Sequence, residues 1–166
     1  MRVHADTPYT PVLVGARRDE LDAILKRYPT RMAALLPALW MIQNAIGWVS
    51  EDGISEVAHA LELTPAYVKG VISFYTMYQK HPVGKHFVQV CTTSPCGACG
   101  ADDVVKAFLE HTGCKELGLT SPDGKYTVIE VECLGACGFP TPVMINSEFL
   151  ESVTPERVPS ILAQLK

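Results

Sequence analysis

Hydrophobic residues in the first part of the chain recur at the three- and four-residue intervals that are typical of amphipathic helices. Two such stripes come first, with the inward residues Leu21, Ile24, Leu25, Tyr28, Leu35, Leu39, Ile42 and Ile46. Pro29 is expected to end the first helix, while Thr30 can cap the second helix and Gly47 can end it. Pro37 predicts either a kink in the second helix or a place in its first turn.

Two further helices are predicted from their starting residues. Ser50 is a favourable helix cap, and Glu51 and Asp52 behind it suit the positive end of the helix dipole. Thr64 followed by Pro65 marks the start of the fourth helix, because proline suits the first helical position. The short connections between these helices predict a compact antiparallel bundle over residues 18–80.

The first 17 residues contain two prolines and no hydrophobic period. They predict a loose extension, which is either ordered by a partner or a disordered tail. The chain is therefore expected to divide into an extension (1–17), a helical bundle (18–80) and a second domain (81–166). Pro82 and Gly84 mark the connection into that domain.

The pattern changes after residue 81, where short alternating stretches predict strands. We expect strands at 86–90, 126–132, 142–146 and 148–152, and helices at about 100–112 and 155–165. The helices should bury the hydrophobic residues Ala101, Val104, Val105, Phe108, Val158, Ile161, Leu162 and Leu165. Ser121-Pro-Asp-Gly124 predicts a turn. One parallel crossover between strands predicts a four-stranded mixed sheet covered by helices, and an α+β fold for the whole chain.

Composition narrows the class of protein. The net charge is −4 and no basic cluster is present, which argues against nucleic-acid binding. No apolar run approaches the roughly 18 residues that a spanning helix needs, so we expect no direct membrane insertion. The mean hydropathy of +0.14 indicates surface that is buried against a partner. Cytoplasmic residence with reduced thiols is expected, and there clustered cysteines indicate metal or redox chemistry.

Four cysteines in two pairs are the main candidates for such chemistry. They form Cys91-Thr-Thr-Ser-Pro-Cys96 and Cys133-Leu-Gly-Ala-Cys137, each directly after a predicted strand. Thiolates select zinc, copper(I) or iron–sulfur clusters. These spacings are wider than the Cys-x2-Cys knuckles of structural zinc, and they favour a [2Fe-2S] cluster, in which each iron takes two thiolates. Zinc, disulfides and unliganded thiols remain alternatives at this point.

A bound cluster would carry net negative charge and would need backbone N–H donors aimed at its sulfurs. Small residues in the two loops allow a close approach of the backbone, and we expect donors among Gly97, Ala98, Gly135, Ala136 and Gly138.

Other candidate groups suggest competing functions. Cys96-Gly-Ala-Cys99 could be a dithiol redox pair, with Cys99 at the start of a helix that lowers its pKa, although no tryptophan precedes the pair. Cys114 is interpreted as an ordinary buried or half-buried thiol. His86 could ligate iron as in a Rieske centre, but four thiolates already suffice. No glycine-rich phosphate loop is visible, so we expect neither NADH nor FMN on this chain.

The sequence around the cysteines closely resembles one protein family. The likeness lies in the run from Phe74-Tyr-Thr-Met-Tyr through Pro82-Val-Gly-Lys-His86 to Cys96, and in Val131-Glu-Cys133-Leu-Gly-Ala-Cys137. The family is the thioredoxin-like [2Fe-2S] subunit of the NADH-oxidising module of respiratory NADH:quinone oxidoreductase (complex I). Related subunits occur in NAD-linked hydrogenases and formate dehydrogenases. The likeness covers about residues 18–166, and Cys99 departs from it, because the family usually has another residue there.

This resemblance implies an electron-transfer subunit with a thioredoxin-like fold over residues 81–166. It implies one [2Fe-2S] cluster held by Cys91, Cys96, Cys133 and Cys137. It also implies that a partner flavoprotein subunit binds FMN and NADH and forms a heterodimer with this chain. That heterodimer would belong to a larger complex at the inner face of the membrane. The bundle and the aromatic run from Phe74 to Tyr78 are the candidate docking surface for this partner.

Overall fold

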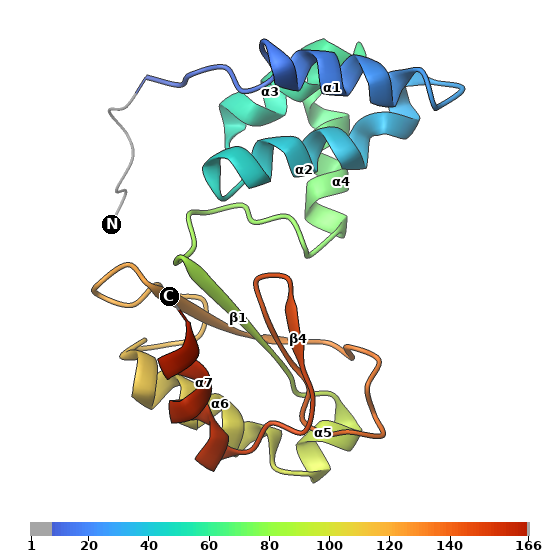
Figure 1. Ribbon diagram of the computed structural model, residues 1–166. Helices are drawn as coiled ribbons and strands as arrows, with labels where there is room; N and C mark the ends of the chain where they lie inside the picture. Colours follow the sequence, from blue (N-terminus) through green and yellow to red (C-terminus); the bar gives the residue numbers. More distant parts are fainter. Residues whose placement is uncertain (1–7, 166) are drawn as a thin grey trace. The chain divides into compact units, whose positions relative to one another are not determined.

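The computed structural model describes residues 8–165, and the chain divides between Pro82 and Val83 into two units (Figure 1). The N-terminal unit contains α1 (Ala16–Leu25), the 3-10 turn η1 (Arg31–Ala34), α2 (Leu35–Ile46), α3 (Glu51–Leu61) and α4 (Pro65–Phe74). The C-terminal unit contains β1 (His86–Cys91), α5 (Ser94–Ala98), α6 (Ala101–Thr112), β2 (Tyr126–Val131), β3 (Val143–Ile145), β4 (Glu148–Leu150), η2 (Pro155–Arg157) and α7 (Val158–Gln164). None of the helices described between residues 8 and 165 is long and apolar enough to cross a membrane.

Helix starts and ends in the N-terminal unit follow local side-chain chemistry. The Ser50 hydroxyl accepts a hydrogen bond from the Gly53 N–H at 3.0 Å, and the Thr64 hydroxyl accepts one from the Tyr67 N–H at 3.3 Å. Gly47 ends α2 with a φ of 86°, a left-handed conformation that glycine adopts without strain. The predicted roles of these three residues are confirmed, and Pro37 lies in the first turn of α2.

Three details of the helix prediction are wrong. The first helix ends at Leu25, so Tyr28 lies beyond it with 40% of its surface exposed. Pro29 disfavours helical backbone at the residue before it, and the chain leaves the helix one turn earlier. Ile46 is the last residue of α2 and is 39% exposed rather than inward. Thr30 makes no side-chain cap and precedes the 3-10 turn η1 instead of α2.

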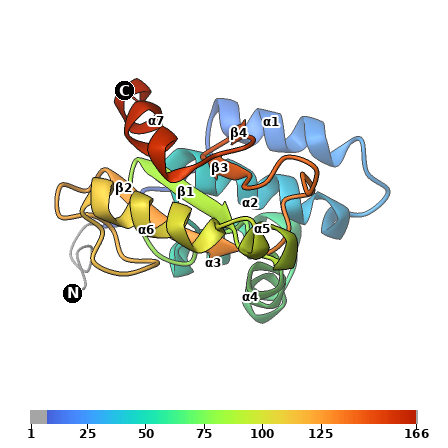
Figure 2. The same ribbon diagram turned by 90° about the horizontal axis from the view of Figure 1, so that it is seen from below.

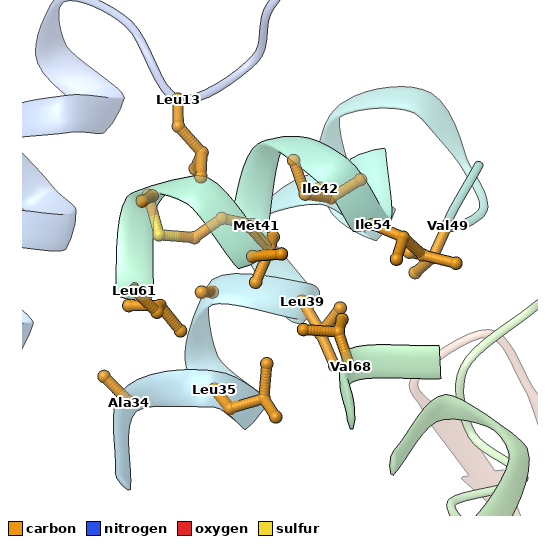
Figure 3. Packing of buried hydrophobic residues seen from close by; sticks show 14 of the residues in the cluster. Leu13, Ala34, Leu35, Leu39, Met41, Ile42, Val49, Ile54, Leu61 and Val68 are labelled. Atoms are coloured by element: carbon orange, nitrogen blue, oxygen red, sulfur yellow. The ribbon is translucent and has the colours of Figure 1, made fainter. Parts of the chain in front are cut away.

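The N-terminal unit is held together by one hydrophobic core. Figure 3 shows side chains from α2, α3 and α4, together with Leu13, directed into a shared interior. Leu39 and Ile42 of α2 are fully buried, as are Val57 of α3 and Val68 of α4. Burying such side chains is the main force that joins short helices, which are marginal in isolation.

Residues 8–17 differ from the expected loose extension, whose first seven residues lie outside the described part of the chain. Val12 and Leu13 are buried in the core of the bundle. The Glu56 carboxylate on α3 accepts hydrogen bonds from the Val12 N–H at 3.1 Å, the Leu13 N–H at 2.8 Å and the Tyr9 hydroxyl. Burial and the hydrogen bond to Glu56 raise the pKa of Tyr9. A single carboxylate therefore fastens this segment to the bundle.

Replacing Glu56 with alanine is expected to lower the free energy of unfolding of the N-terminal unit by about 2 kcal/mol, because hydrogen bonds to a charged acceptor are lost together. Thermal melting and amide exchange at Val12 and Leu13 would measure the effect. Glu20→Ala, which removes an exposed carboxylate from α1, is the matched control and should change stability by less than about 0.5 kcal/mol. Unchanged protection of Val12 and Leu13 in Glu56→Ala would contradict this account of the fastening.

The C-terminal unit contains the predicted four-stranded mixed sheet, in the order β2-β1-β3-β4. The first two strands are parallel, with register from His86 opposite Tyr126 to Cys91 opposite Val131. The pairs β1–β3 and β3–β4 are antiparallel. Figures 1 and 2 show α6 and α7 packed beside the sheet, and Val104, Phe108 and Val158 meet its buried strand residues there. The α+β fold class is confirmed.

Boundaries in this unit are the less accurate part of the prediction. The strands β3 and β4 have three residues each and are shorter than expected. The final helix begins with the 3-10 turn η2 after Thr154, and α7 proper starts at Val158. The turn at 121–124 is confirmed by the Gly124 N–H, which donates to the Ser121 carbonyl at 2.9 Å. The short helix α5, directly after the first predicted strand, was not expected.

Candidate metal centre

The first cysteine pair is held by regular structure on both sides. Cys91 is the last residue of β1, and its N–H donates to the Pro142 carbonyl at 3.2 Å. Cys96 lies inside α5, where its N–H donates to the Thr93 carbonyl at 2.8 Å. Both thiols are buried. The signal for α5 was present in Ser94-Pro95, because proline is favourable in the first helical turn.

The second cysteine pair lies in the loop after β2, and both of its thiols are exposed. The sulfurs of Cys133 and Cys137 are 3.6 Å apart. The Gly135 N–H donates to the Cys133 sulfur at 3.4 Å, and Gly135 has a φ of 86°. This left-handed conformation favours glycine and bends the loop so that a backbone donor faces the sulfur.

The two loops meet at Cys91. The backbone N–H of Leu134, a residue of the second loop, lies near the Cys91 sulfur and lowers the pKa of Cys91. Leu134 also packs against a small buried cluster formed by Cys91, Cys96 and Ala101. The structure therefore brings the predicted cysteine pairs together at one end of β1 and β2.

Hydrogen bonds and charge make the two thiols of the first pair unequal. Burial raises the pKa of Cys91, but hydrogen bonds from the N–H groups of Leu134 and Thr93 and from Cys96, together with the nearby Thr93 hydroxyl, lower it below the ordinary value. Burial, a hydrogen bond to Cys91 and its charge raise the pKa of Cys96 to about 11. Cys91 is thus the preferred thiolate of this pair.

In the second pair, the pKa of Cys137 is raised. A hydrogen bond to Cys133 and the charge of Cys133 raise the pKa of Cys137, and Cys91 adds to this effect. The charges of Cys137 and Cys133 also act on Cys96, so the two pairs interact electrostatically. Removing four protons from thiols this close together requires a compensating positive charge, which metal ions supply.

The backbone donors only partly match the prediction. Gly135 does donate to a sulfur, but the Gly97 N–H is used inside α5, where it donates to the Thr93 carbonyl at 3.0 Å. The expectation is therefore wrong for Gly97, while Ala98, Ala136 and Gly138 stay predictions. Leu134 and Thr93, whose N–H groups face Cys91, were not predicted as donors, because the prediction was limited to small residues of the two loops. Backbone N–H groups carry no such signal, since any residue but proline can supply one.

The remaining candidate residues lie away from this arrangement or are ordinary. Cys99 is exposed and follows the end of α5, two residues before α6 begins, so the expected place at the start of a helix is wrong. Cys114 is buried, as predicted, and its thiol donates to the Tyr126 carbonyl at 3.5 Å. His86 is at the opposite end of β1 from Cys91, with its ring beside Tyr126.

The chemistry of the donor set fits a two-iron cluster. Within residues 8–165, no group of three or more cysteine, histidine or acidic side chains is arranged to hold a single metal ion as it stands. The cysteines form two pairs of soft ligands, one from each loop, and backbone N–H groups already face the sulfurs of Cys91 and Cys133. Two thiolates for each of two irons, with N–H donors to sulfur, are the requirements of a [2Fe-2S] site.

Comparison with known proteins agrees with this fit. Residues 21–166 match the model of a protein family described as thioredoxin-like [2Fe-2S] ferredoxin. The chain belongs to this family. Membership confirms the resemblance that the sequence showed, the thioredoxin-like fold and a [2Fe-2S] cluster as the cofactor. It favours the iron–sulfur interpretation over the zinc and dithiol alternatives.

Individual proteins are similar to this chain over most of its length. A subunit of the NADH-quinone oxidoreductase of Rickettsia bellii is 40% identical over 148 residues, which are 87% of this chain and 88% of the relative. The mitochondrial NADH dehydrogenase [ubiquinone] flavoprotein 2 of Dictyostelium discoideum is 39% identical over 150 residues, which are 89% of this chain and 60% of the relative.

The fold of the family is also found in a solved hydrogenase. The NAD+-reducing [NiFe]-hydrogenase in its air-oxidised state matches with a TM-score of 0.68 at 18% sequence identity. The match covers 79% of this chain and 22% of the hydrogenase chain. At this level of identity the likeness concerns the fold alone.

Proposed function

We propose that this chain is the electron-transfer subunit of the NADH-oxidising module of NADH:quinone oxidoreductase. It would hold one [2Fe-2S] cluster and exchange electrons with the FMN of a partner flavoprotein subunit. Two proteins named for NADH dehydrogenase [ubiquinone] and NADH-quinone oxidoreductase support this function, because they are 39% and 40% identical to this chain. The observation that carries it is the convergence of the two cysteine loops: Cys91 lies opposite Val131 in the parallel pair of β1 and β2, and Leu134 packs against Cys91 and Cys96.

The four ligands in this proposal are Cys91, Cys96, Cys133 and Cys137. Each pair would serve one iron, and the sulfurs of Cys133 and Cys137 are 3.6 Å apart. When bound, the cluster supplies a one-electron redox step. The chain's own contribution is to supply the four thiolates, to bury Cys91 and Cys96 away from water and to aim N–H donors at sulfur.

NADH oxidation requires a second polypeptide in this proposal. NADH gives up a hydride, which a one-electron centre cannot accept, so a flavin must divide the electron pair. This sequence contains no recognisable nucleotide-binding loop. The FMN and NADH sites would therefore lie on the partner flavoprotein, as a heterodimer within the larger complex. The chain would then be cytoplasmic, and peripheral to the inner face of the membrane through that complex.

The N-terminal unit offers a surface for this partner. Phe74 is 76% exposed, and Tyr75 and Met77 next to it are also exposed. A groove of about 280 Å³ adjoins them, lined by Thr30, Met32, Ala33, Leu35, Leu36, Tyr67, Val71 and Tyr75. Exposed apolar residues that cluster in this way are typical of protein interfaces. Tyr78 is not part of this surface, because it is 1% exposed and its hydroxyl donates to the Leu36 carbonyl at 2.9 Å.

A soluble NAD-linked hydrogenase or formate dehydrogenase is the second candidate host complex. The sequence resemblance around the two cysteine pairs, which extends to related subunits of these enzymes, supports this candidate. The chemistry proposed for this chain is the same in both hosts, since each must connect a two-electron nicotinamide reaction to one-electron carriers.

Analysis of the purified protein for iron, zinc and acid-labile sulfide tests the proposed cofactor site. Two irons and two sulfides per chain, with the visible colour of an iron–sulfur protein, are expected. One zinc per chain without colour would replace the proposal with a zinc-stabilised binding module. Absence of metal together with dithiol reductase activity would instead support the thioredoxin-like alternative.

A further inference from the structure

Thr93 differs from the two hydroxyl residues that cap α3 and α4. Ser50 and Thr64 precede α3 and α4, and each accepts a hydrogen bond from a backbone N–H in the first turn. Thr93 precedes α5 with the same extended backbone, at φ −60° and ψ 154°, yet its side chain makes no such bond. The Thr93 hydroxyl is therefore not used as a cap of α5.

The Thr93 hydroxyl oxygen is buried without a hydrogen-bond partner among the described residues. Within residues 8–165, only one other buried side-chain oxygen or nitrogen shares this state, the hydroxyl of Thr141. Both threonines belong to the segments that surround the cysteines: Thr93 lies between Cys91 and Cys96, and Thr141 lies four residues after Cys137. Buried polar groups are almost always hydrogen-bonded, so a buried hydroxyl without a partner between two candidate ligands indicates an acceptor that belongs to a bound group.

The acceptor for Thr93 lies on the Cys91 side of the site. Thr93 follows the end of β1 two residues after Cys91, and its hydroxyl lies near the Cys91 sulfur. The hydroxyl nonetheless falls short of a full hydrogen bond to that sulfur. The Thr93 O–H group can therefore still donate a hydrogen bond, and it lies close to Cys91. Such a donor is suited to a negatively charged sulfur of an iron–sulfur group.

We propose that the Thr93 hydroxyl donates a hydrogen bond to a sulfur of the bound cluster, on the Cys91 side, and thereby raises the cluster's reduction potential. The inference rests on the proposed function and adds a residue that tunes it. Reduction adds one negative charge to the cluster, and a fixed O–H donor stabilises the reduced form more than the oxidised form. Thr93 would thus set how readily the cluster accepts an electron.

Thr93→Val tests this role, because valine keeps the branched shape and removes the hydroxyl. Redox titration of the purified chain, followed by EPR, should show the reduction equilibrium shifted toward the oxidised form by about threefold to tenfold, where tenfold is about 59 mV for one electron. Thr93→Ser keeps a hydroxyl and should stay close to the wild-type potential. Thr64→Val removes a threonine hydroxyl at the start of another helix and should leave the potential unchanged.

The outcomes separate this inference from the proposed function. If the wild-type chain binds no cluster, both the proposed function and the role of Thr93 are contradicted. A loaded Thr93→Val protein with an unchanged or raised potential would overturn the role of Thr93 alone. If Thr93→Val does not load a cluster, Thr93→Ala compared with Thr93→Ser makes the same test, and equal potentials in that pair would also overturn it.

Discussion

We expect the affinity for iron to fall by about tenfold or more when serine replaces any one of Cys91, Cys96, Cys133 and Cys137. Loss of a group that only supports a metal ligand commonly costs that much, and loss of a ligand itself should cost at least as much. A serine hydroxyl is a hard and weakly acidic ligand that replaces thiolate poorly. Cys99→Ser and Cys114→Ser should keep the visible spectrum and the iron content. Visible absorption and iron analysis of the six purified variants would measure the effect.

Cys96 and Cys99 form the decisive comparison in this set. Cys96 is buried and hydrogen-bonded to Cys91, while Cys99 is exposed at the end of α5. We therefore expect loss in Cys96→Ser and retention in Cys99→Ser. The reverse pattern would show that Cys99 is the ligand. Because neighbouring cysteines can substitute for each other, the double variant Cys96→Ser/Cys99→Ser identifies such a rescue by losing a cluster that Cys96→Ser alone retains.

Reduction by NADH is expected to depend completely on the partner flavoprotein. The isolated chain should be reduced by dithionite and should not react with NADH, because it offers no flavin to divide the hydride's two electrons. Co-expression with an NADH- and FMN-binding flavoprotein subunit should give a stable heterodimer whose cluster is reduced by NADH. Anaerobic visible and EPR spectra after addition of NADH would measure the difference.

A variant of the exposed surface supplies the control for this experiment. Phe74→Ser should weaken the heterodimer, because Phe74 is the most exposed of the large apolar residues on the proposed docking surface. Its cluster should still be reduced by dithionite. FMN binding and NADH oxidation by the isolated chain would contradict the division of labour, as would a failure of the wild-type pair to associate.

Much of the fold could be predicted from residues whose chemistry acts locally. Ser50, Thr64 and Gly47 marked helix ends because their capping geometry depends on only a few neighbouring residues. The parallel pairing of β1 with β2 followed from the helix between them. The two cysteine pairs were visible for a similar reason, since each pair is close in sequence.

Features that depend on distant contacts could not be predicted in the same way. Glu56 fastens Val12 and Leu13 across more than 40 residues, and nothing in the local pattern marks it. The aromatic run could not be divided by sequence into the exposed Phe74 and the buried Tyr78. The Leu134 N–H that joins the cysteine loops is a backbone group, and its direction depends on the loop conformation rather than on the side chain.

Low-temperature EPR of the dithionite-reduced chain tests the central claim most directly. A [2Fe-2S] cluster accepts one electron, so the reduced protein should show a single unpaired-electron signal that integrates to about one spin per chain. The signal should be absent in the oxidised protein. A reduced protein that contains its metal but gives no such signal, or a signal that persists unchanged when both Cys91 and Cys133 are replaced by serine, would contradict the account.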